Sequence, residues 1–245
     1  MSVVFISVSN MGCIELTMNH LESLKRVGMT NYMAYAIDTE CYETLCSKGY
    51  NAFLLGRDDL KNFQVWQTKA FDYLSFMRYH VIDNLLRQGK TVWYLDVDTV
   101  VLQNLNPYVE FMRDKFDAAL QDDCYMPCTG CMLFFPSALS LMKPMVEMEK
   151  FNINDQAYFE PVLKKSKLRV GVLNRNQFPN GLLYFNEDNA KYVDKQREFR
   201  NSDPSQVMFV HANWMVGLQT KIDALKSKGL WFLSARSASE NAESE

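Results

Sequence analysis

The chain has 245 residues, of which 48% are hydrophobic and 22% are charged, and its formal net charge is −3. This length and apolar content are sufficient for one large α/β domain with a full hydrophobic core. The small net charge and the lack of a long basic stretch argue against nucleic acid as the main partner. No stretch approaches 18 uninterrupted apolar residues, so no transmembrane helix is expected.

The N-terminal residues MSVVFISVSN lack a basic segment and alternate apolar residues with serine, which is typical of a first strand and not of a signal peptide. A cytoplasmic protein with reduced cysteines is therefore expected. Three of the six cysteines, Cys124, Cys128 and Cys131, form a C-x3-C-x2-C cluster. Zinc binding is one interpretation of this cluster, but a fourth ligand at a standard spacing is missing, so buried structural thiols are favoured.

The first half of the chain alternates short apolar runs with helical patterns. The expected strands are residues 3–8, 32–37, 51–55 and 91–102. The expected helices are residues 14–27, 39–48 and 68–88. Gly28, Gly49 and Gly89 follow these helices, at positions where helices normally end. This alternation predicts an α/β fold with a mostly parallel central sheet flanked by helices.

The second half of the chain is less regular. The expected strands are residues 117–121, 132–135, 169–173, 182–185 and 208–210. The expected helices are residues 137–150, a segment that Asn154 caps, and residues 220–228. The last dozen residues, 234–245, are small, polar and charged, and they are expected to be disordered.

Two carboxylates interrupt the most apolar strand of the chain. Residues 91–102, TVWYLDVDTVVL, read as a strand that is buried on both faces and carries Asp96 and Asp98. Ionised acids are costly in such a place, and two so close together repel each other unless a cation lies between them. If the strand ends near Asp96, the acids lie at its carboxyl end, where α/β sheets place ligands, and they predict a site for Mg²⁺ or Mn²⁺ that would hold a substrate phosphate.

One arginine stands on a helix face that is otherwise apolar. At about 100° per residue, the helix at 68–88 places Leu74, Ile82 and Leu85 on one apolar face, and Arg78 projects into the middle of that face. A charged group there needs a partner. The guanidinium either pairs with a structural carboxylate or strand end, or reaches a ligand at the edge of the sheet.

Other polar residues stand at the ends of expected elements. His211 follows an apolar strand and precedes Gly217 and Lys221, so it could add a metal ligand beside a cation for a diphosphate, although a structural histidine is the alternative. The other two histidines lie on expected helices without polar neighbours and are treated as structural. Asp155 starts a helix, where it either caps the helix or handles sugar hydroxyls or a reacting centre.

Together these residues resemble a known family. In chain order the set is Arg78, YLDVD at 94–98, CTG at 128–130, NDQ at 154–156, FPNG at 178–181, HANWMVG at 211–217, Lys221 and Trp231. It resembles the nucleotide-diphospho-sugar transferase family of glycosyltransferases with the GT-A fold, which includes plant cell-wall xylosyl- and arabinosyltransferases of glycosyltransferase family 77. The D-x-D pair is common to many GT-A families, whereas the combination of C-T-G, F-P-N-G and H-x-N-W-x-x-G is more specific.

The resemblance implies a metal-dependent transferase that moves a sugar from a nucleotide-diphospho-sugar to a hydroxyl of a glycan or another acceptor. UDP is the default nucleotide, and GDP is the alternative. Residues 1–233 would form one GT-A domain, with a nucleotide-binding half at 1–102 and a half for sugar and acceptor at 103–233.

By position, the resemblance also implies roles for individual residues. Asp96, Asp98 and His211 would hold Mn²⁺ or Mg²⁺, and Asp96 could instead touch the ribose. Lys221 and the Gly217 backbone would hold the diphosphate. The remaining contacts would come from Arg78 as the family's basic residue, from Ser9, Asn10 and Asp38 at the nucleoside, and from Asp123, Thr129, Gly130, Asp155 and Gln156 at the donor sugar and acceptor.

The stereochemical course remains open at this stage. If the enzyme inverts the anomeric carbon, a carboxylate must act as general base, and Asp155 is the first choice with Asp123 second. If it retains the configuration, as the plant relatives suggest, Asp155 or Gln156 would stabilise the oxocarbenium-like centre. Retention is slightly favoured.

Two other functions compete with a transferase. Asp96 and Asp98 loosely fit the opening motif of haloacid-dehalogenase-type phosphatases, but that motif normally follows the first strand, and here three strands precede it. A non-catalytic module that binds nucleotide-sugars is the other alternative, against which the intact acids and His211 argue.

Overall fold

The structure is a computed structural model that describes residues 3–148, 153–186 and 192–233. A seven-stranded sheet in the order β3-β2-β1-β4-β7-β6-β8 forms its centre. These strands are β1 (Val3–Ser9), β2 (Tyr32–Ala36), β3 (Ala52–Leu54), β4 (Thr91–Leu95), β6 (Ala118–Asp122), β7 (Pro127–Phe134) and β8 (Val170–Leu173). Only β7 runs antiparallel to its neighbours in this sheet, which confirms the predicted α/β fold with a mostly parallel sheet.

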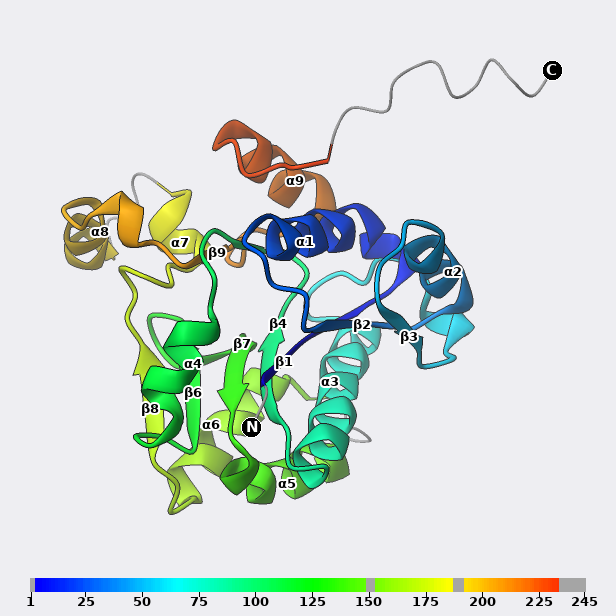
Figure 1. Cartoon of the computed structure of the whole chain (residues 1–245), viewed down its shortest axis with the longest axis horizontal. Helices are drawn as coiled ribbons and strands as arrows, with labels where there is room; N and C mark the ends of the chain where they lie inside the picture. Colours follow the sequence, from blue (N-terminus) through cyan, green and yellow to red (C-terminus); the bar gives the residue numbers. More distant parts are fainter. Residues whose placement is uncertain (1–2, 149–152, 187–191, 234–245) are drawn as a thin grey trace.

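Helices cover both faces of the sheet (Figure 1). One face packs against α1 (Ile14–Arg26), α2 (Thr39–Ser47) and α4 (Asn106–Arg113), and the core there includes Leu24, Trp93 and Leu133. The other face packs against α3 (Lys69–Arg87), α5 (Met142–Met148) and α6 (Asp155–Lys165). Alternate residues of β4 enter the two cores because side chains alternate across a strand. A buried sheet of this kind explains the continuous apolar runs in the sequence.

The predicted strand at 91–102 is divided into two. β4 ends at Leu95, and the chain turns at residues 96–98 before β5 (Thr99–Val101) begins. β5 pairs with β9 (Phe209–His211) in a separate two-stranded antiparallel sheet. A third apolar cluster joins these strands to α9 (Leu218–Ser227), which Figure 1 shows beside α1. The apolar run at 91–102 thus forms two strands, and the break falls at the two aspartates, which lie at the carboxyl end of β4.

Two other predictions of secondary structure need correction. In place of the strand expected at 182–185 the chain forms a short helix, α7 (Gly181–Tyr184), whose start is capped by the Asn180 side chain, which accepts a hydrogen bond from the Leu183 backbone N–H. The expected helix at 137–150 begins as a 3-10 helix, Pro136–Leu141, and continues as α5, which places Pro144 in the first turn, where proline is tolerated.

The other helices largely match the predictions. The Asn154 side chain caps α6 as predicted by accepting from the Ala157 backbone. A further helix that the sequence patterns did not indicate is α8 (Val193–Arg200). The predicted disordered segment, 234–245, lies outside the described residues.

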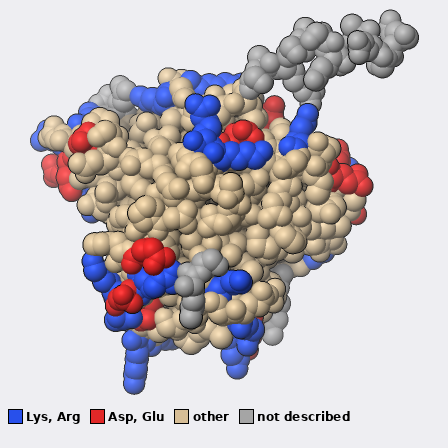
Figure 2. Space-filling model, in the orientation of Figure 1, with Lys and Arg blue, Asp and Glu red and all other residues tan. Residues whose placement is uncertain are grey.

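Charged side chains lie mainly at the edges of the face shown in Figure 2, where basic and acidic groups are mixed. The middle of this face is broad and uncharged. Among the described helices, none combines the length and the apolar character that crossing a membrane requires.

Candidate active site

A cavity of about 700 Å³ opens beside the ends of β1 and β4. It collects side chains that are far apart in the sequence. The predicted site residues that line it are Ser9, Asn10, Arg78, Asp96, Asp98, Asp123, Thr129, Gly130, Asp155, Gln156, His211, Gly217 and Lys221. The tertiary structure therefore brings together every predicted site residue except Asp38.

The turn after β4 places the two aspartates. The Asp96 backbone N–H donates to the Gly130 carbonyl at 2.7 Å, and the Thr99 N–H donates back to the Asp96 carbonyl at 3.0 Å. Thr99 then pairs with His211 across β5 and β9. This pairing brings His211 beside Asp98, although 113 positions separate them in the chain.

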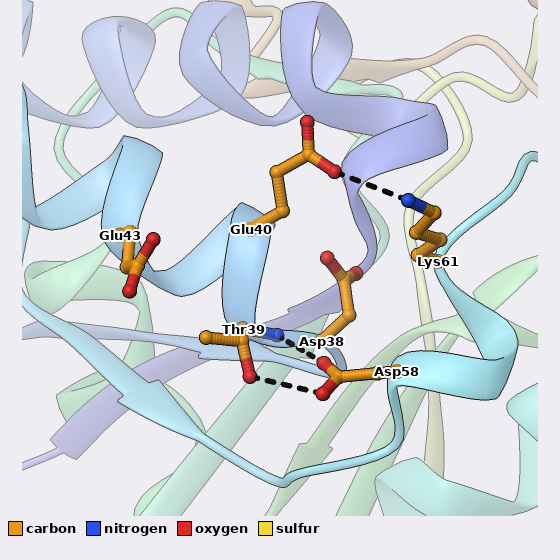
Figure 3. A pocket seen from close by; sticks show the side chains of 6 residues that line it. All are labelled: Asp38, Thr39, Glu40, Glu43, Asp58 and Lys61. Atoms are coloured by element: carbon orange, nitrogen blue, oxygen red, sulfur yellow. Dashed lines mark hydrogen bonds and ion pairs between the residues drawn. The ribbon is translucent and has the colours of Figure 1, made fainter.

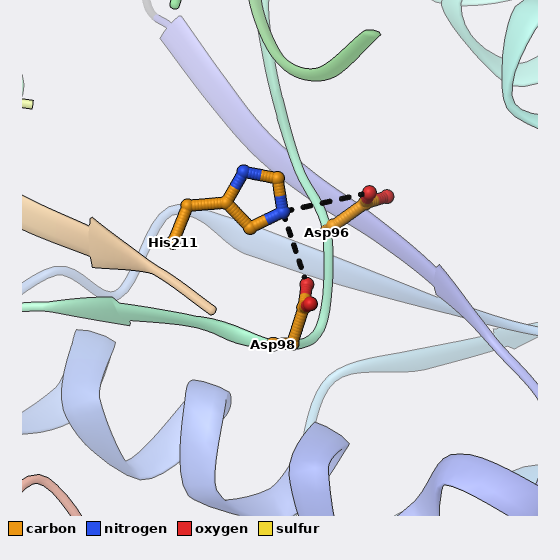
Figure 4. A group of neighbouring side chains, drawn as sticks. All are labelled: Asp96, Asp98 and His211. Atoms are coloured by element: carbon orange, nitrogen blue, oxygen red, sulfur yellow. Dashed lines mark ion pairs between the residues drawn. The ribbon is translucent and has the colours of Figure 1, made fainter. Parts of the chain in front are cut away.

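Asp96, Asp98 and His211 point toward one another (Figure 4). His211 Nε2 lies 3.2 Å from Asp98 Oδ1 and 3.8 Å from Asp96 Oδ2. One potential ligand atom from each residue lies within 4.8 Å of the others. Two carboxylates and one imidazole form a donor set suited to a divalent cation, so the described residues contain a site that could hold one.

Gly130 leaves the space that this cluster needs. A Cβ atom at this position would lie 2.4 Å from Asp96 Oδ2 and 2.6 Å from His211 Cε1. Any larger residue would therefore press into both side chains. This close approach explains the glycine of the C-T-G motif, which lies within β7, a strand that begins earlier than the expected strand at 132–135.

Gln121 orients the histidine ring. Its amide nitrogen donates to the carbonyls of Phe178 and Pro179, both at 3.1 Å, so its oxygen faces His211 Nδ1 at 2.8 Å. A proton on Nδ1 satisfies this oxygen, so Nε2 would be the atom that coordinates a cation held by the aspartates. Such outer partners fix the tautomer of metal-binding histidines. The sequence analysis missed Gln121, because nothing in a buried strand pattern marks one amide as functional.

Arg78 pairs with the first aspartate. Its guanidinium is buried, lies 3.2 Å from Asp96 Oδ1 and donates to the Thr129 carbonyl at 2.7 Å. The hydroxyl of Tyr94 also donates to Asp96 Oδ1, at 2.5 Å. Burial raises the pKa of Asp96, and the charge of Arg78 opposes that shift. The helix therefore delivers its one core-facing arginine to the edge of the sheet.

Lys221 pairs with the second aspartate. Its Nζ lies 2.5 Å from Asp98 Oδ2, on the first turns of α9. Burial alone would raise the pKa of Asp98, but the charges of Lys221 and His211 outweigh it and hold that pKa well below its ordinary value. Burial lowers the pKa of Lys221, and the attraction of Asp98 more than offsets this, so the pKa is raised and the amine stays charged.

Asp123, Asp155 and Gln156 also line the cavity. Gln156 Nε2 donates to Asp123 Oδ2 at 2.9 Å. Asp155 is buried and accepts from the Tyr79 hydroxyl at 3.0 Å. Tyr79 is a second residue that the sequence analysis missed, since it reads as an ordinary aromatic residue of a helix.

Asp38 lies apart from this cavity. Its two carboxylate oxygens accept from the backbone N–H groups of Met11 and Cys41, at 2.8 and 2.9 Å, and the second of these bonds caps α2. Figure 3 shows it in a small separate pocket near Thr39 and Asp58. A helix cap accounts for this aspartate, and its contact with a nucleobase stays a prediction.

The cysteines give no support for the zinc interpretation. The six are all free thiols. Cys128 and Cys131 are buried, with Sγ atoms 3.7 and 3.6 Å from His211 Nδ1. Burial raises the pKa of Cys128 to about 12, so it remains a neutral thiol. In the described part of the chain, the group with metal-ligand geometry is the Asp-Asp-His cluster, and no cysteine belongs to it.

The family model of nucleotide-diphospho-sugar transferases matches residues 27–225. The chain belongs to this family. The match covers every strand of the central sheet except β1, together with the Asp-Asp-His cluster and most of α9, and it confirms the resemblance seen in the sequence motifs. It also leaves the phosphatase interpretation without support.

Relatives of this family member are enzymes of sugar transfer. A UDP-galactose:fucoside α-3-galactosyltransferase of Dictyostelium discoideum is 21% identical over 94% of this chain and 43% of its own length. A UDP-D-xylose:L-fucose α-1,3-D-xylosyltransferase of Arabidopsis thaliana is 26% identical over 68% of this chain and 49% of its own length. The chain thus spans about half the length of the relatives it matches.

Solved glycosyltransferases share the fold. The galactosyltransferase LgtC, determined with donor and acceptor sugar analogues, superposes with a TM-score of 0.58 at 11% identity, covering 96% of this chain and 98% of LgtC. The glycosyltransferase GlyE of Streptococcus pneumoniae gives a TM-score of 0.57 at 14% identity, covering 96% of this chain and 65% of GlyE. At these identities the comparison establishes the GT-A fold.

Proposed function

We propose that this chain transfers a sugar from a UDP-sugar to a hydroxyl of a glycan acceptor, with Mn²⁺ or Mg²⁺ at Asp96, Asp98 and His211. The observation that carries the proposal is the convergence of these three ligands with Lys221 in one cavity. A divalent cation bound there would supply positive charge to a diphosphate leaving group. All four of these residues lie within the part of the chain that the family model matches.

The chain's own residues add to that charge. Lys221 is charged and buried beside the cluster, and its helix begins at Gly217, which lines the cavity. The start of a helix presents unpaired backbone N–H groups and favours anions. Lys221 and this helix start would hold the diphosphate and stabilise negative charge as the bond to the sugar breaks.

The nucleoside is expected near the end of β1. Asn10 donates to the carbonyls of Leu60 and Asn62, at 2.7 and 2.8 Å, which leaves its side-chain oxygen without a partner among the described residues. Ser9 lies beside it on the cavity wall. An N–H donor of a nucleobase would complement the Asn10 oxygen, which supports a nucleoside at this end.

Asp155 and Gln156 are the favoured groups at the reacting centre. Asp123 already accepts from three N–H donors, so it is a poor choice for a general base. The relatives' names specify α-linked products and fucose or fucoside acceptors. Because common UDP-sugars are α-linked, an α-linked product would mean retention, with Asp155 or Gln156 stabilising the positive charge that develops at the anomeric carbon.

The first test is calorimetric binding of UDP and GDP with and without Mn²⁺, on the wild-type chain and on Asp98→Ala. Asp223→Ala, on the exposed side of α9, is the control. Micromolar UDP binding that requires Mn²⁺ and disappears only in Asp98→Ala supports the donor site. Metal-independent binding, or no binding of either nucleotide, contradicts it.

The second test measures UDP release from UDP-xylose and UDP-galactose, with and without methyl α-L-fucoside. Acceptor-stimulated UDP release with a glycosylated product supports a transferase that uses fucosides. Tight nucleotide-sugar binding without any turnover would instead support the non-catalytic module.

A further inference from the structure

Three aromatic rings meet at the rim of the cavity, and together they are called the aromatic platform here: Tyr125, Tyr192 and Trp214. Their ring centroids are 5.3 to 6.1 Å apart. Tyr192 is buried, whereas Trp214 is 40% exposed and Tyr125 is 54% exposed. The two exposed rings line the cavity. Large aromatic surfaces left open beside a polar site are typical of ligand contacts.

Trp214 is held rigidly. Its indole Nε1 donates to Asp123 Oδ1 at 2.6 Å. Its backbone has a φ of 61°, in the left-handed region that a residue with a bulky side chain rarely adopts. Such a conformation is energetically unfavourable and persists only where the surrounding structure enforces it, often at functional sites.

The F-P-N-G motif holds the segment around Trp214 in this backbone conformation. The Gly181 backbone N–H donates to Asn213 Oδ1 at 2.7 Å, and Asn213 Nδ2 donates to Asp123 Oδ1 at 2.8 Å. A Cβ atom at Gly181 would lie 1.9 Å from the Asn213 carbonyl oxygen, so only glycine fits. Two sequence motifs more than 30 residues apart thus fix the indole beside the cavity.

The rim offers what a sugar ring needs. A pyranose presents C–H groups on one face and hydroxyls around its edge. The Trp214 and Tyr125 rings could stack on the C–H groups of the pyranose. The Gln156 amide, which is bonded to Asp123 and also lines the cavity, could bond to its hydroxyls. Most pockets that bind small molecules combine apolar surface with a few oriented polar groups in this way.

The position of the platform distinguishes acceptor from donor. The nucleoside is proposed near the end of β1, the Asp-Asp-His cluster follows β4, and Asp123 follows β6. β4 and β7 separate β1 from β6 in the sheet, a span of about 14 Å at the usual strand spacing. A donor that extends from β1 across the cluster would present its sugar toward the platform.

We propose that the aromatic platform binds the acceptor sugar, a pyranoside whose apolar face stacks on Trp214, and that Asp123 is a positioning residue that holds the indole. The assignment to the acceptor rests on the proposed function. The binding of a pyranoside at Trp214 can be tested without any donor.

The experiment is saturation-transfer NMR with methyl α-L-fucoside, methyl β-D-galactoside and methyl β-D-xyloside, with and without UDP and Mn²⁺. The proteins are the wild type, Trp214→Ala, Trp214→Phe, and the control Phe111→Ala, which removes an exposed ring on α4. Near-ultraviolet circular dichroism checks their folding. If Trp214→Ala fails to fold, Tyr125→Ala takes its place, because it removes the other exposed ring and leaves the indole bond intact.

At least one glycoside should bind the wild type, with the strongest transfer to the C–H protons of one ring face. Trp214→Ala should weaken binding about tenfold or more, Trp214→Phe should retain part of it, and Phe111→Ala should bind normally. Equal binding by Trp214→Ala, or no binding of any glycoside to the wild type, overturns the proposal. Glycoside binding through Trp214 without binding of UDP would support the platform and contradict the proposed donor.

Discussion

Replacing Gln121 with methionine tests whether this residue of β6 controls metal binding at the Asp-Asp-His cluster. Methionine has nearly the same length and shape but cannot accept from His211 Nδ1 or donate to the carbonyls of Phe178 and Pro179. The Pro179 carbonyl keeps a bond from the His211 backbone, whereas the Phe178 carbonyl loses its amide donor. The ring of His211 then loses the bond that fixes its tautomer.

The expected effects have different sizes. Loss of an outer partner of a metal-binding histidine typically weakens metal affinity by about 10- to 100-fold. The orphaned Nδ1–H and carbonyl should lower the free energy of unfolding by about 1–3 kcal/mol each where they are buried. Calorimetric titration of Mn²⁺ in the presence of UDP measures the first effect, and urea unfolding measures the second.

The matched control is Gln103→Met. Gln103 Nε2 also bridges two carbonyls, those of Ser205 and Val207, at 2.6 and 3.0 Å, but it lies away from the cavity. It should keep wild-type affinity for Mn²⁺. If Gln121→Met binds Mn²⁺ as tightly as Gln103→Met does, whatever its stability, Gln121 does not support metal binding through His211.

Three further predictions concern single residues. Gly130→Ala should weaken Mn²⁺ binding more than tenfold in calorimetry, because its methyl group would lie 2.4 Å from Asp96 Oδ2; wild-type affinity would contradict this. Burial lowers the pKa of His20 to about 4 in the folded protein. The contribution of the neutral ring to the free energy of unfolding is therefore fully present above pH 6.5 and is lost as the pH drops toward 4. Urea unfolding at pH 7 and 4.5 should show a loss of about 2–3 kcal/mol that is absent in His20→Gln. Hydrogen bonds from Arg169 lower the pKa of Asp117 to about 2, so its contribution is present above pH 4 and fades toward pH 2. Asp117→Asn should cost about 1–2 kcal/mol at pH 7 and little at pH 2, and an equal cost at both values would refute the ionic origin.

The sequence alone determined the layers of the fold and the chemistry of the site. Apolar runs that alternate with amphipathic helices are enough to predict a buried α/β sheet. Two acids beside an apolar run, and one arginine on a core-facing helix stripe, indicated Asp96, Asp98 and Arg78, because charges in such places need partners. These inferences depend on local pattern, which the sequence carries directly.

The tertiary structure decided what local pattern cannot. The break of the 91–102 strand and the reversal of β7 depend on pairing with β9, β4 and β6, which are distant in the chain. Likewise Gln121 and Tyr79 look like ordinary core residues, and the role of Trp214 within its motif stays undefined, until their partners are in place. A hydrogen bond to a residue 90 positions away leaves no periodic signal in the sequence, so the orientation of His211 and of the aromatic platform follows only from the fold.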